Sequence, residues 1–181
     1  MTPIAAYLLV LGWASIPFAP AEPMLVGAGS YAATGALHLP LVVAVAAGGS
    51  LASDLAKYAL GRLAGPALLR RLGRRESGAR AIAWIETRMR RIGPAVIVPS
   101  YFVPFAVVAA TLLCGVLRMR LGPVVAASVV GAAAWSSLFV LLGYAGGAVT
   151  HNPLTGALLA LPVAFGLAMV LSRVTTSRTP G

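Results

Sequence analysis

Acidic side chains are the residues of this sequence best suited to do chemistry, because only four occur among its 181 residues. One of them, Glu22, lies in Pro17-Phe18-Ala19-Pro20-Ala21-Glu22-Pro23, with apolar sequence on both sides. An ionised carboxylate is costly in hydrocarbon, so such a group faces water, pairs with a cation or carries a proton. We expect Glu22 to gate a pathway or to exchange protons. The alternative is a cap for a helix that begins near Pro23, where the helix dipole favours negative charge.

A second acid, Asp54, precedes Lys57 by three residues and Arg62 by eight. Both spacings bring a basic side chain to the helix face that carries the carboxylate. Asp54 and Lys57 therefore either form a local ion pair directed towards the membrane interface or line a polar pathway. An anchor at the interface is the simpler interpretation of Arg62. Further along the chain, Ser100 and Tyr101 are candidate polar linings, with packing as the simplest role for Tyr101.

Motifs of hydrolytic and metal chemistry are absent from the sequence. It contains no Gly-x-Ser-x-Gly, His-Glu-x-x-His or Cys-x-x-Cys pattern and no closely spaced pair of carboxylates. Its single cysteine, Cys114, cannot form a disulfide within the chain, and we expect it to pack. The sequence therefore predicts neither an enzyme nor a cofactor or metal site.

The composition is that of an integral membrane protein. Hydrophobic residues make up 59% of the chain, charged residues 10%, and the mean hydropathy is +0.90. An ordinary soluble domain carries about 25% charged residues, so a cytosolic enzyme is excluded. The net charge of +10 raises the alternative of nucleic-acid binding. However, ten of the fourteen basic residues lie between Lys57 and Arg91, flanked by apolar sequence, which is the positive-inside pattern of a membrane protein. We expect no nucleic-acid partner.

Prolines interrupt two of the apolar segments. Ile4–Ile16 is followed by the proline-rich stretch around Glu22 and then by Met24–Leu39, while Gly93–Val116 contains three prolines of its own. Proline breaks a continuous helix, and irregular backbone at membrane depth survives only where protein or a wet cavity covers it. Both segments are therefore expected to be re-entrant helical hairpins. The prolines that would allow rearrangement are Pro17, Pro20, Pro99 and Pro104.

The remaining apolar runs predict membrane spans. Leu41–Leu63 is long enough to cross and is expected to end at Gly65-Pro66, and Leu121–Tyr144 is a second span. A turn at Gly146–Asn152 then leads to a final span at Pro153–Leu171.

Between the first span and the second hairpin, residues 66–92 form a basic segment. Apolar residues recur at helical spacing, with arginines among the polar positions and Trp84 nearby, which predicts an amphipathic helix at the interface rather than a solvated loop helix. The apolar positions are Ile82, Ile85, Met89 and Ile92.

An internal repeat relates the two halves of the chain. Adding 82 to Pro17, Gly49, Gly61 and Gly65 gives Pro99, Gly131, Gly143 and Gly147. The placement of basic residues puts residues 62–91 and the C-terminus on the cytoplasmic side, so the repeated spans run in opposite directions. We therefore expect a single all-α membrane domain, 1–181, with inverted topology, as in secondary transporters. Its parts are a first repeat at about 4–65, the basic segment at 66–92, a second repeat at about 93–147 and the final span at 153–172.

The order of these features resembles the DedA family, also called the SNARE-associated or VTT-domain family. The resemblance runs from Ile16 to Gly147 and rests on five ordered stretches. They are Pro17-Phe18-Ala19-Pro20-Ala21-Glu22-Pro23, Gly49-x4-Asp54-x3-Tyr58-x2-Gly61-Arg62-x2-Gly65, Tyr101-Phe102-Val103-Pro104, Gly115-x3-Met119, and Trp135 followed by Leu142-Gly143-Tyr144-x-Gly146. It implies opposed re-entrant hairpins and the movement of phospholipids or polyprenyl-phosphate carriers across a bacterial inner membrane, coupled to protons or the membrane potential.

Three family positions differ in this sequence. Glu22 matches the acid of the first hairpin, but the acid expected about a dozen residues earlier is replaced by Val10 and its apolar neighbours. Tyr101 and Val107 stand where the family has arginines, the natural bidentate ligands of phosphate. Either this chain handles a different headgroup, or Asp54, Lys57 and Arg62 supply the missing polarity, or transport is lost.

These expectations define two functions. The first is a lipid or lipid-carrier transporter in a bacterial inner membrane, with membrane lipids as partners and Glu22 as the gating acid. The second is a membrane scaffold or assembly factor of the same fold that does not transport, in which interfacial glycines serve helix contacts. A water-accessible cavity reaching Glu22 favours the first, and dry packing around it favours the second. The sequence leaves a homo-oligomer open.

Overall fold

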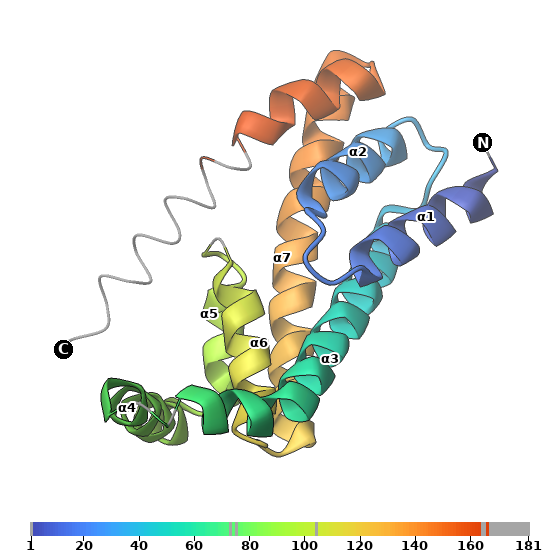
Figure 1. Ribbon diagram of the computed structural model, residues 1–181. Coiled ribbons are helices and arrows are strands. Elements are labelled where there is room, and N and C mark those ends of the chain that lie inside the picture. The colour runs from blue at the N-terminus through green and yellow to red at the C-terminus, as the bar shows by residue number, and fades with distance from the viewer. Residues whose placement is uncertain (1, 73, 75, 104, 164–165, 167–181) are drawn as a thin grey trace.

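Two long helices form the frame of the molecule. The computed structural model describes residues 2–72, 74, 76–103, 105–163 and 166, and every regular element in these residues is helical. The long helices are α3 (Leu39–Leu72) and α7 (Leu121–Thr150), which contact each other and converge towards the lower end of the molecule in Figure 1. Each contains a stretch long and apolar enough to cross a membrane, Leu39–Gly65 and Leu121–Thr150. The all-α prediction is confirmed for the described residues.

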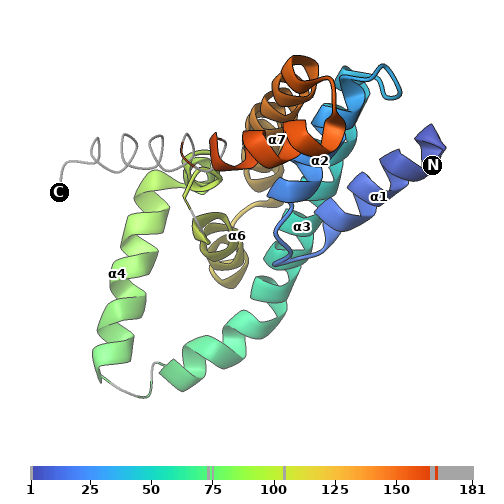
Figure 2. The ribbon, with the colours of Figure 1, turned by 90° about the horizontal axis from the view of Figure 1, so that it is seen from above.

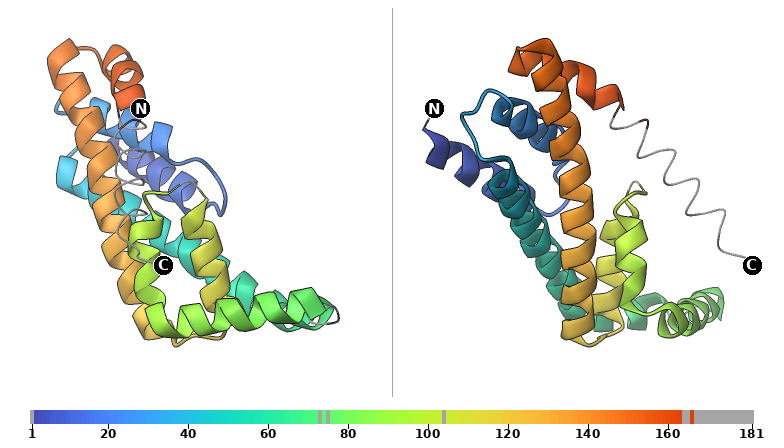
Figure 3. Two further views of the ribbon diagram at one scale, coloured as in Figure 1. Left: turned by 90° about the vertical axis from the view of Figure 1, so that its left-hand side faces the viewer. Right: turned by 180° about the vertical axis from the view of Figure 1, so that it is seen from behind.

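Shorter helices form two helical hairpins beside this frame. The first consists of α1 (Pro3–Ser15) and α2 (Glu22–Ala32), and the second of η1 (Pro94–Val96), α5 (Ile97–Ser100) and α6 (Ala106–Val116). They approach from opposite ends of α7, and the bends of both lie near its middle (Figures 1 and 3). Each bend contains a phenylalanine in the left-handed region, Phe18 with φ 71° and Phe105 with φ 60°. The breaks predicted from the prolines are therefore found in the structure.

The two halves of the chain exchange helices. The first arm of each hairpin packs on the long helix of its own half, α1 on α3 and α5 on α7. The second arm packs on the long helix of the other half, α2 on α7 and α6 on α3. Because of this exchange, neither half can bury its apolar surface without the other.

Glycines allow the exchanged helices to approach closely. A Cβ atom on Gly61 would collide with the backbone of Leu112 in α6, and one on Gly143 would collide with the backbone of Val26 in α2. Gly115 and Gly29 return the contacts, against Tyr58 and Val140. The long-helix members, Gly61 with Gly143 and Tyr58 with Val140, are each 82 residues apart (143 − 61 and 140 − 58). The same offset therefore relates the long-helix members of equivalent contacts, while their hairpin partners, Gly29 with Gly115 and Val26 with Leu112, are 86 residues apart (115 − 29 and 112 − 26).

Two expected helix ends are wrong. The first long helix does not end at Gly65-Pro66 but continues to Leu72, since proline can bend a helix without ending it. The predicted turn at Gly146–Asn152 is helical as far as Thr150, because Gly146 and Gly147 serve as close contacts for Gly156 rather than as turn residues. The last described helix covers Pro153–Val163, and the rest of the predicted final span lies outside the described residues.

Helix α4 (Glu76–Ile92) lies beside the bundle at the end where α3 finishes and α7 begins, and it runs back towards η1 (Figures 1 and 2). Met89 on this helix is buried, whereas Trp84 is 67% exposed. The side chains of Ile82 and Ile85 lie outside those that the structure describes. An interfacial position for α4 stays a prediction.

Candidate functional site

A buried carboxylate stands at the middle of the first long helix. Asp54 is the sixteenth residue of the 27-residue stretch Leu39–Gly65, two residues from its centre. At 1.5 Å of rise per residue this is about 3 Å along the helix axis. The side chain is only 1% exposed. A buried carboxylate is stable only with a cation, hydrogen bonds or a proton, so its neighbours decide what it can do.

Two side chains contact the Asp54 carboxylate. Lys57 Nζ lies 2.8 Å from Asp54 Oδ1, and the Tyr101 hydroxyl donates a hydrogen bond of 2.7 Å to Oδ2. Lys57 is 5% exposed and Tyr101 9%. The lysine comes from the same helix one turn away, as the three-residue spacing predicts, while the tyrosine comes from the second hairpin, 47 residues along the chain. Asp54, Lys57 and Tyr101 form the buried triad.

The contact between Lys57 and Asp54 is ionic rather than a directed hydrogen bond. Asp54 Oδ1 has no hydrogen-bond partner among the described residues, although the Lys57 ammonium lies close to it. Hydrogen bonds to a carboxylate depend on alignment as well as on distance. Oδ1 therefore keeps unused acceptor capacity inside the protein.

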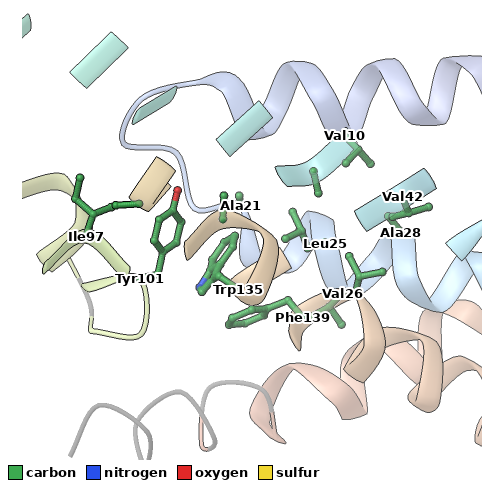
Figure 4. Close-up of a cluster of buried hydrophobic side chains, with 14 of the residues drawn as sticks. Val10, Ala21, Leu25, Val26, Ala28, Val42, Ile97, Tyr101, Trp135 and Phe139 are labelled. Atoms are coloured by element: carbon green, nitrogen blue, oxygen red, sulfur yellow. The ribbon is translucent and has the colours of Figure 1, made fainter. Parts of the chain in front are cut away.

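Aromatic packing fixes the position of Tyr101. A Cβ atom on Gly131 of α7 would overlap the Tyr101 ring, so glycine leaves the space that this ring fills. The ring centroid of Trp135 lies 6.0 Å from that of Tyr101 and 4.8 Å from that of Phe139. Figure 4 shows this row on α7 between Ile97 and Tyr101 of the second hairpin and Ala21 and Leu25 of the first. The row therefore connects the two hairpins through one helix.

Helix α7 also carries buried hydroxyl groups without partners. The Oγ atoms of Ser128 and Ser136 are buried and make no hydrogen bond among the described residues. Ser128 lies at helical spacing from Gly131 and Trp135, the residues that contact Tyr101. Buried hydroxyls are normally satisfied, so each of these is a free polar contact in an otherwise apolar interior.

Glu22 does not join the triad in the described contacts. It is the first residue of α2, and its side chain is half-buried and forms no hydrogen bond or ion pair with the described residues. Both sequence interpretations remain compatible with this position, because the first turn of a helix favours negative charge. An apolar cavity of about 200 Å³ lies between α1 and α2 and is lined by the next residue, Pro23, among others.

The other predicted lining residues have structural roles. The Ser100 hydroxyl donates to Ile97 O at 2.6 Å, so it is used within its own helix. The Arg62 side chain is exposed and donates to the Tyr58 hydroxyl at 3.0 Å, in keeping with an anchor near the end of the apolar stretch Leu39–Gly65.

The predicted hinge prolines lie at or beside the hairpin bends. Pro17 and Pro20 belong to the loop between α1 and α2, where Pro20 O accepts a hydrogen bond of 3.0 Å from the Trp13 indole. Pro99 lies within α5, and Pro104 is outside the described residues.

Two residues that contribute to the site were not assigned a role from the sequence. The Tyr58 hydroxyl donates to Met119 O at 2.6 Å and so ties α3 to the loop before α7. Trp135 stacks beside Tyr101. Both residues stand in the stretches that carry the family resemblance, which is the sequence signal that could have drawn attention to them. Among the residues described, no group of three or more histidine, cysteine or acidic side chains is placed to hold a metal.

Comparison with known proteins gives the family. The model of the VTT domain matches residues 16–145, which is more than half of the chain. The chain belongs to the VTT-domain (DedA) family. It is also similar to the uncharacterized membrane protein YbfM of Bacillus subtilis (strain 168), with 28% identity over 137 residues, covering 75% of this chain and 84% of the relative. No solved structure matches the chain significantly.

Membership in the VTT-domain family supports reading the long apolar helices as parts of a membrane protein. Within this VTT-domain protein, Tyr101 contacts the buried carboxylate, and Val107 is half-buried on α6. Lys57 is the one buried cationic side chain among those that the structure describes. Positive charge at the centre of the described molecule therefore comes from α3 and not from the second hairpin.

Proposed function

We propose that this protein transports a phospholipid or a polyprenyl-phosphate carrier across a bacterial inner membrane. The observation that carries the proposal is the buried triad, since it joins a long helix of one half to the hairpin of the other at mid-length. Transporters with inverted repeats bind their substrates near the bilayer midplane, where broken helices from the two halves meet. Polar groups at that depth are costly and usually functional.

The helix exchange supports an inverted repeat. Equivalent glycine contacts recur in the two halves, 82 residues apart on the long helices and 86 residues apart on the hairpins, and the hairpins approach the long helices from opposite ends. In a membrane each hairpin would then enter and leave on one face, the first from outside and the second from the cytoplasm, with residues 62–91 and the C-terminus cytoplasmic. Two such halves can rock about a fixed central site.

Lys57 supplies the headgroup chemistry in this mechanism. When a phosphate reaches the triad, the Lys57 ammonium exchanges the Asp54 carboxylate for the phosphate oxygens. Asp54, left without its cation in an apolar interior, then takes up a proton and retains the hydrogen bond to Tyr101. Loss of that proton returns Lys57 to Asp54 and releases the phosphate. Proton coupling follows from the competition of two anions for one cation.

The surroundings of the triad suit the rest of a lipid. The apolar cavity between α1 and α2 offers a surface for an acyl or prenyl chain, and Glu22, which precedes the lining residue Pro23, is the acid that gates entry. Interior hydroxyls such as that of Ser128 offer further polar contacts to a headgroup.

Reconstitution in liposomes tests this function. The purified protein is expected to accelerate translocation of a fluorescent phospholipid or of polyprenyl phosphate, and Asp54→Asn and Glu22→Gln are each expected to lower the rate at least tenfold. Glu76→Gln, an acid at the first residue of α4 and outside both long helices, is the matched control and keeps the wild-type rate. Wild-type rates in Asp54→Asn and Glu22→Gln would refute transport through this site.

The second candidate is a scaffold or assembly protein of the same fold. It is favoured by the replacement of the family arginines by Tyr101 and Val107 and by the apolar lining of the cavity next to Glu22. In that case the triad only holds the hairpins together. Liposomes with the wild-type protein would then show no more translocation than protein-free liposomes, while deletion of the protein from cells would disturb another membrane complex.

A further inference from the structure

A second cavity, which unlike the first has a polar lining, lies at the end of the molecule where α7 begins. It has a volume of about 240 Å³ and is lined by Glu86 of α4 and by the four residues of the loop between α6 and α7: Leu117, Arg118, Met119 and Arg120. The loop and α4 lie at the same end of the bundle (Figures 1 and 3). None of its lining residues belongs to the buried triad, although Met119 O accepts a hydrogen bond from Tyr58, one helical turn beyond Asp54. We name it the loop cavity.

Arginines dominate the charge of the loop cavity. Arg118 and Arg120 are exposed, and neither forms an ion pair with any residue that the structure describes. Arg62 reaches the same loop indirectly, since it donates to the Tyr58 hydroxyl, which itself donates to Met119 O. Glu86 is the one acid in the lining. The cavity therefore presents guanidinium groups that have no protein partner in the described part of the chain.

The backbone at Arg118 adds an independent observation. Met119 N donates to Cys114 O and Arg118 N donates to Gly115 O, each at 2.9 Å, which is the hydrogen-bond pattern that closes a helix with a left-handed residue. Glycine normally occupies that position, but here it is Arg118, with φ 52°. A non-glycine residue held in this region is strained, and such strain gathers at functional sites. The positive side chain is kept where the backbone would prefer glycine.

Arg120 breaks a second local preference. It is the N-cap of α7 and makes no side-chain capping hydrogen bond. A cation at a helix N-terminus opposes the helix dipole, so this position usually favours an uncharged or negative group. An anion in the loop cavity would neutralise both arginines and remove the conflict.

From these observations we infer that the loop cavity binds a phosphate group, contributed by an anionic lipid headgroup at the cytoplasmic surface. Arg118 and Arg120 would hold the phosphate oxygens, and the Tyr58 hydrogen bond to Met119 O would fix the loop that carries them. Arginine matches phosphate with paired hydrogen bonds, and basic pockets beside membrane helices bind such headgroups. This site differs from the central triad and does not depend on transport.

Lipid binding to the purified full-length protein tests the inference. Retention of phosphatidylglycerol and of phosphatidylcholine is measured by native mass spectrometry, with inorganic phosphate as the soluble probe. We expect phosphatidylglycerol to be retained in preference to phosphatidylcholine. Each arginine removed should weaken its binding about fivefold, so Arg118→Gly and Arg120→Gln together should weaken it about 25-fold.

Two features of the variants keep the test decisive. Arg118→Gly restores the residue that the backbone prefers, so its melting temperature should not fall, and a loss of lipid then reflects the lost charge. Arg88→Gln removes an exposed arginine of α4 that does not line the cavity and is the matched control. Competition by inorganic phosphate with the same arginine dependence would support the site and identify free phosphate as its source. Equal retention of both lipids, or an equal loss in Arg88→Gln, would overturn the inference.

Discussion

Removal of one charge of the Asp54–Lys57 pair should lower the stability of the protein far more than removal of both charges. Lys57→Met leaves Asp54 in the interior without its cation, and Asp54→Asn leaves Lys57 without its anion. Since both side chains are at most 7% exposed, water cannot replace the lost partner. Removal of one member of a buried ion pair typically costs about 3–5 kcal/mol. Each single variant should therefore lose about that much free energy of unfolding.

The double variant Asp54→Asn/Lys57→Met should recover most of that loss. It removes both charges, and replacing a buried pair by neutral groups is often close to neutral, so we expect its stability within about 1 kcal/mol of the wild type. Tyr101→Phe, which removes the hydrogen bond to a charged acceptor, should cost about 1.5–3 kcal/mol in the wild type and much less in the double variant. The exposed Arg70→Met on the same helix is the control for loss of a positive charge.

Reversible unfolding in mixed micelles, followed by circular dichroism as denaturing detergent is added, measures these free energies. The expected result is that the double variant loses much less free energy of unfolding than the sum of the losses of the two single variants. The reasoning is refuted if Lys57→Met costs less than about 1 kcal/mol and the double variant is no more stable than the sum of the single effects implies. That outcome would mean that the pair is solvated and does not hold the second hairpin.

Three further predictions follow from the packing. Gly49→Ala should destabilise the protein, because the new Cβ would lie 2.7 Å from the Ala14 Cβ. Gly48→Ala should instead stabilise its helix by about 0.5–1 kcal/mol, because nothing lies within 4 Å of the new Cβ. The same unfolding assay measures both variants. Cys114 is buried, so it should resist a maleimide reagent in the folded protein and react only after denaturation, as followed by mass spectrometry. Ser30→Ala should lower stability by about 0.5–1.5 kcal/mol, because it removes the hydrogen bond of 2.7 Å from Ser30 Oγ to Pro153 O, and an unchanged unfolding curve would contradict the anchoring of the last described helix.

Local patterns in the sequence predict much of the fold. Runs of apolar residues locate both long helices, the prolines around Pro20 locate the first break, and the three-residue spacing of Asp54 and Lys57 predicts their pair. In each case the physical cause lies within a few residues of the feature, so one segment contains the information.

Features that depend on distant segments could not be predicted in this way. The residue type alone does not distinguish a glycine in a turn from a glycine at a close helix contact. For this reason Gly146 was expected to lie in a turn, although the helix continues through it. The hydrogen bond from Tyr101 to Asp54 joins residues 47 apart, and packing is the sequence interpretation of a tyrosine in an apolar hairpin. The left-handed backbone of Arg118 carries no sequence signal, because glycine is the residue expected there.

The central claim is that the two hairpins enter and leave the membrane on opposite faces and meet at the buried triad. Single cysteines placed in a Cys114→Ala background at both ends of each hairpin test this most directly, with a membrane-impermeant thiol reagent applied to vesicles of known orientation. The positions are Ile4 and Thr34 for the first hairpin and Ile92 and Arg118 for the second, all exposed in the structure. We predict that Ile4→Cys and Thr34→Cys react only from the outside and Ile92→Cys and Arg118→Cys only from the cytoplasmic side. Labelling of the two ends of either hairpin from opposite sides would contradict the account, because that hairpin would then cross the membrane.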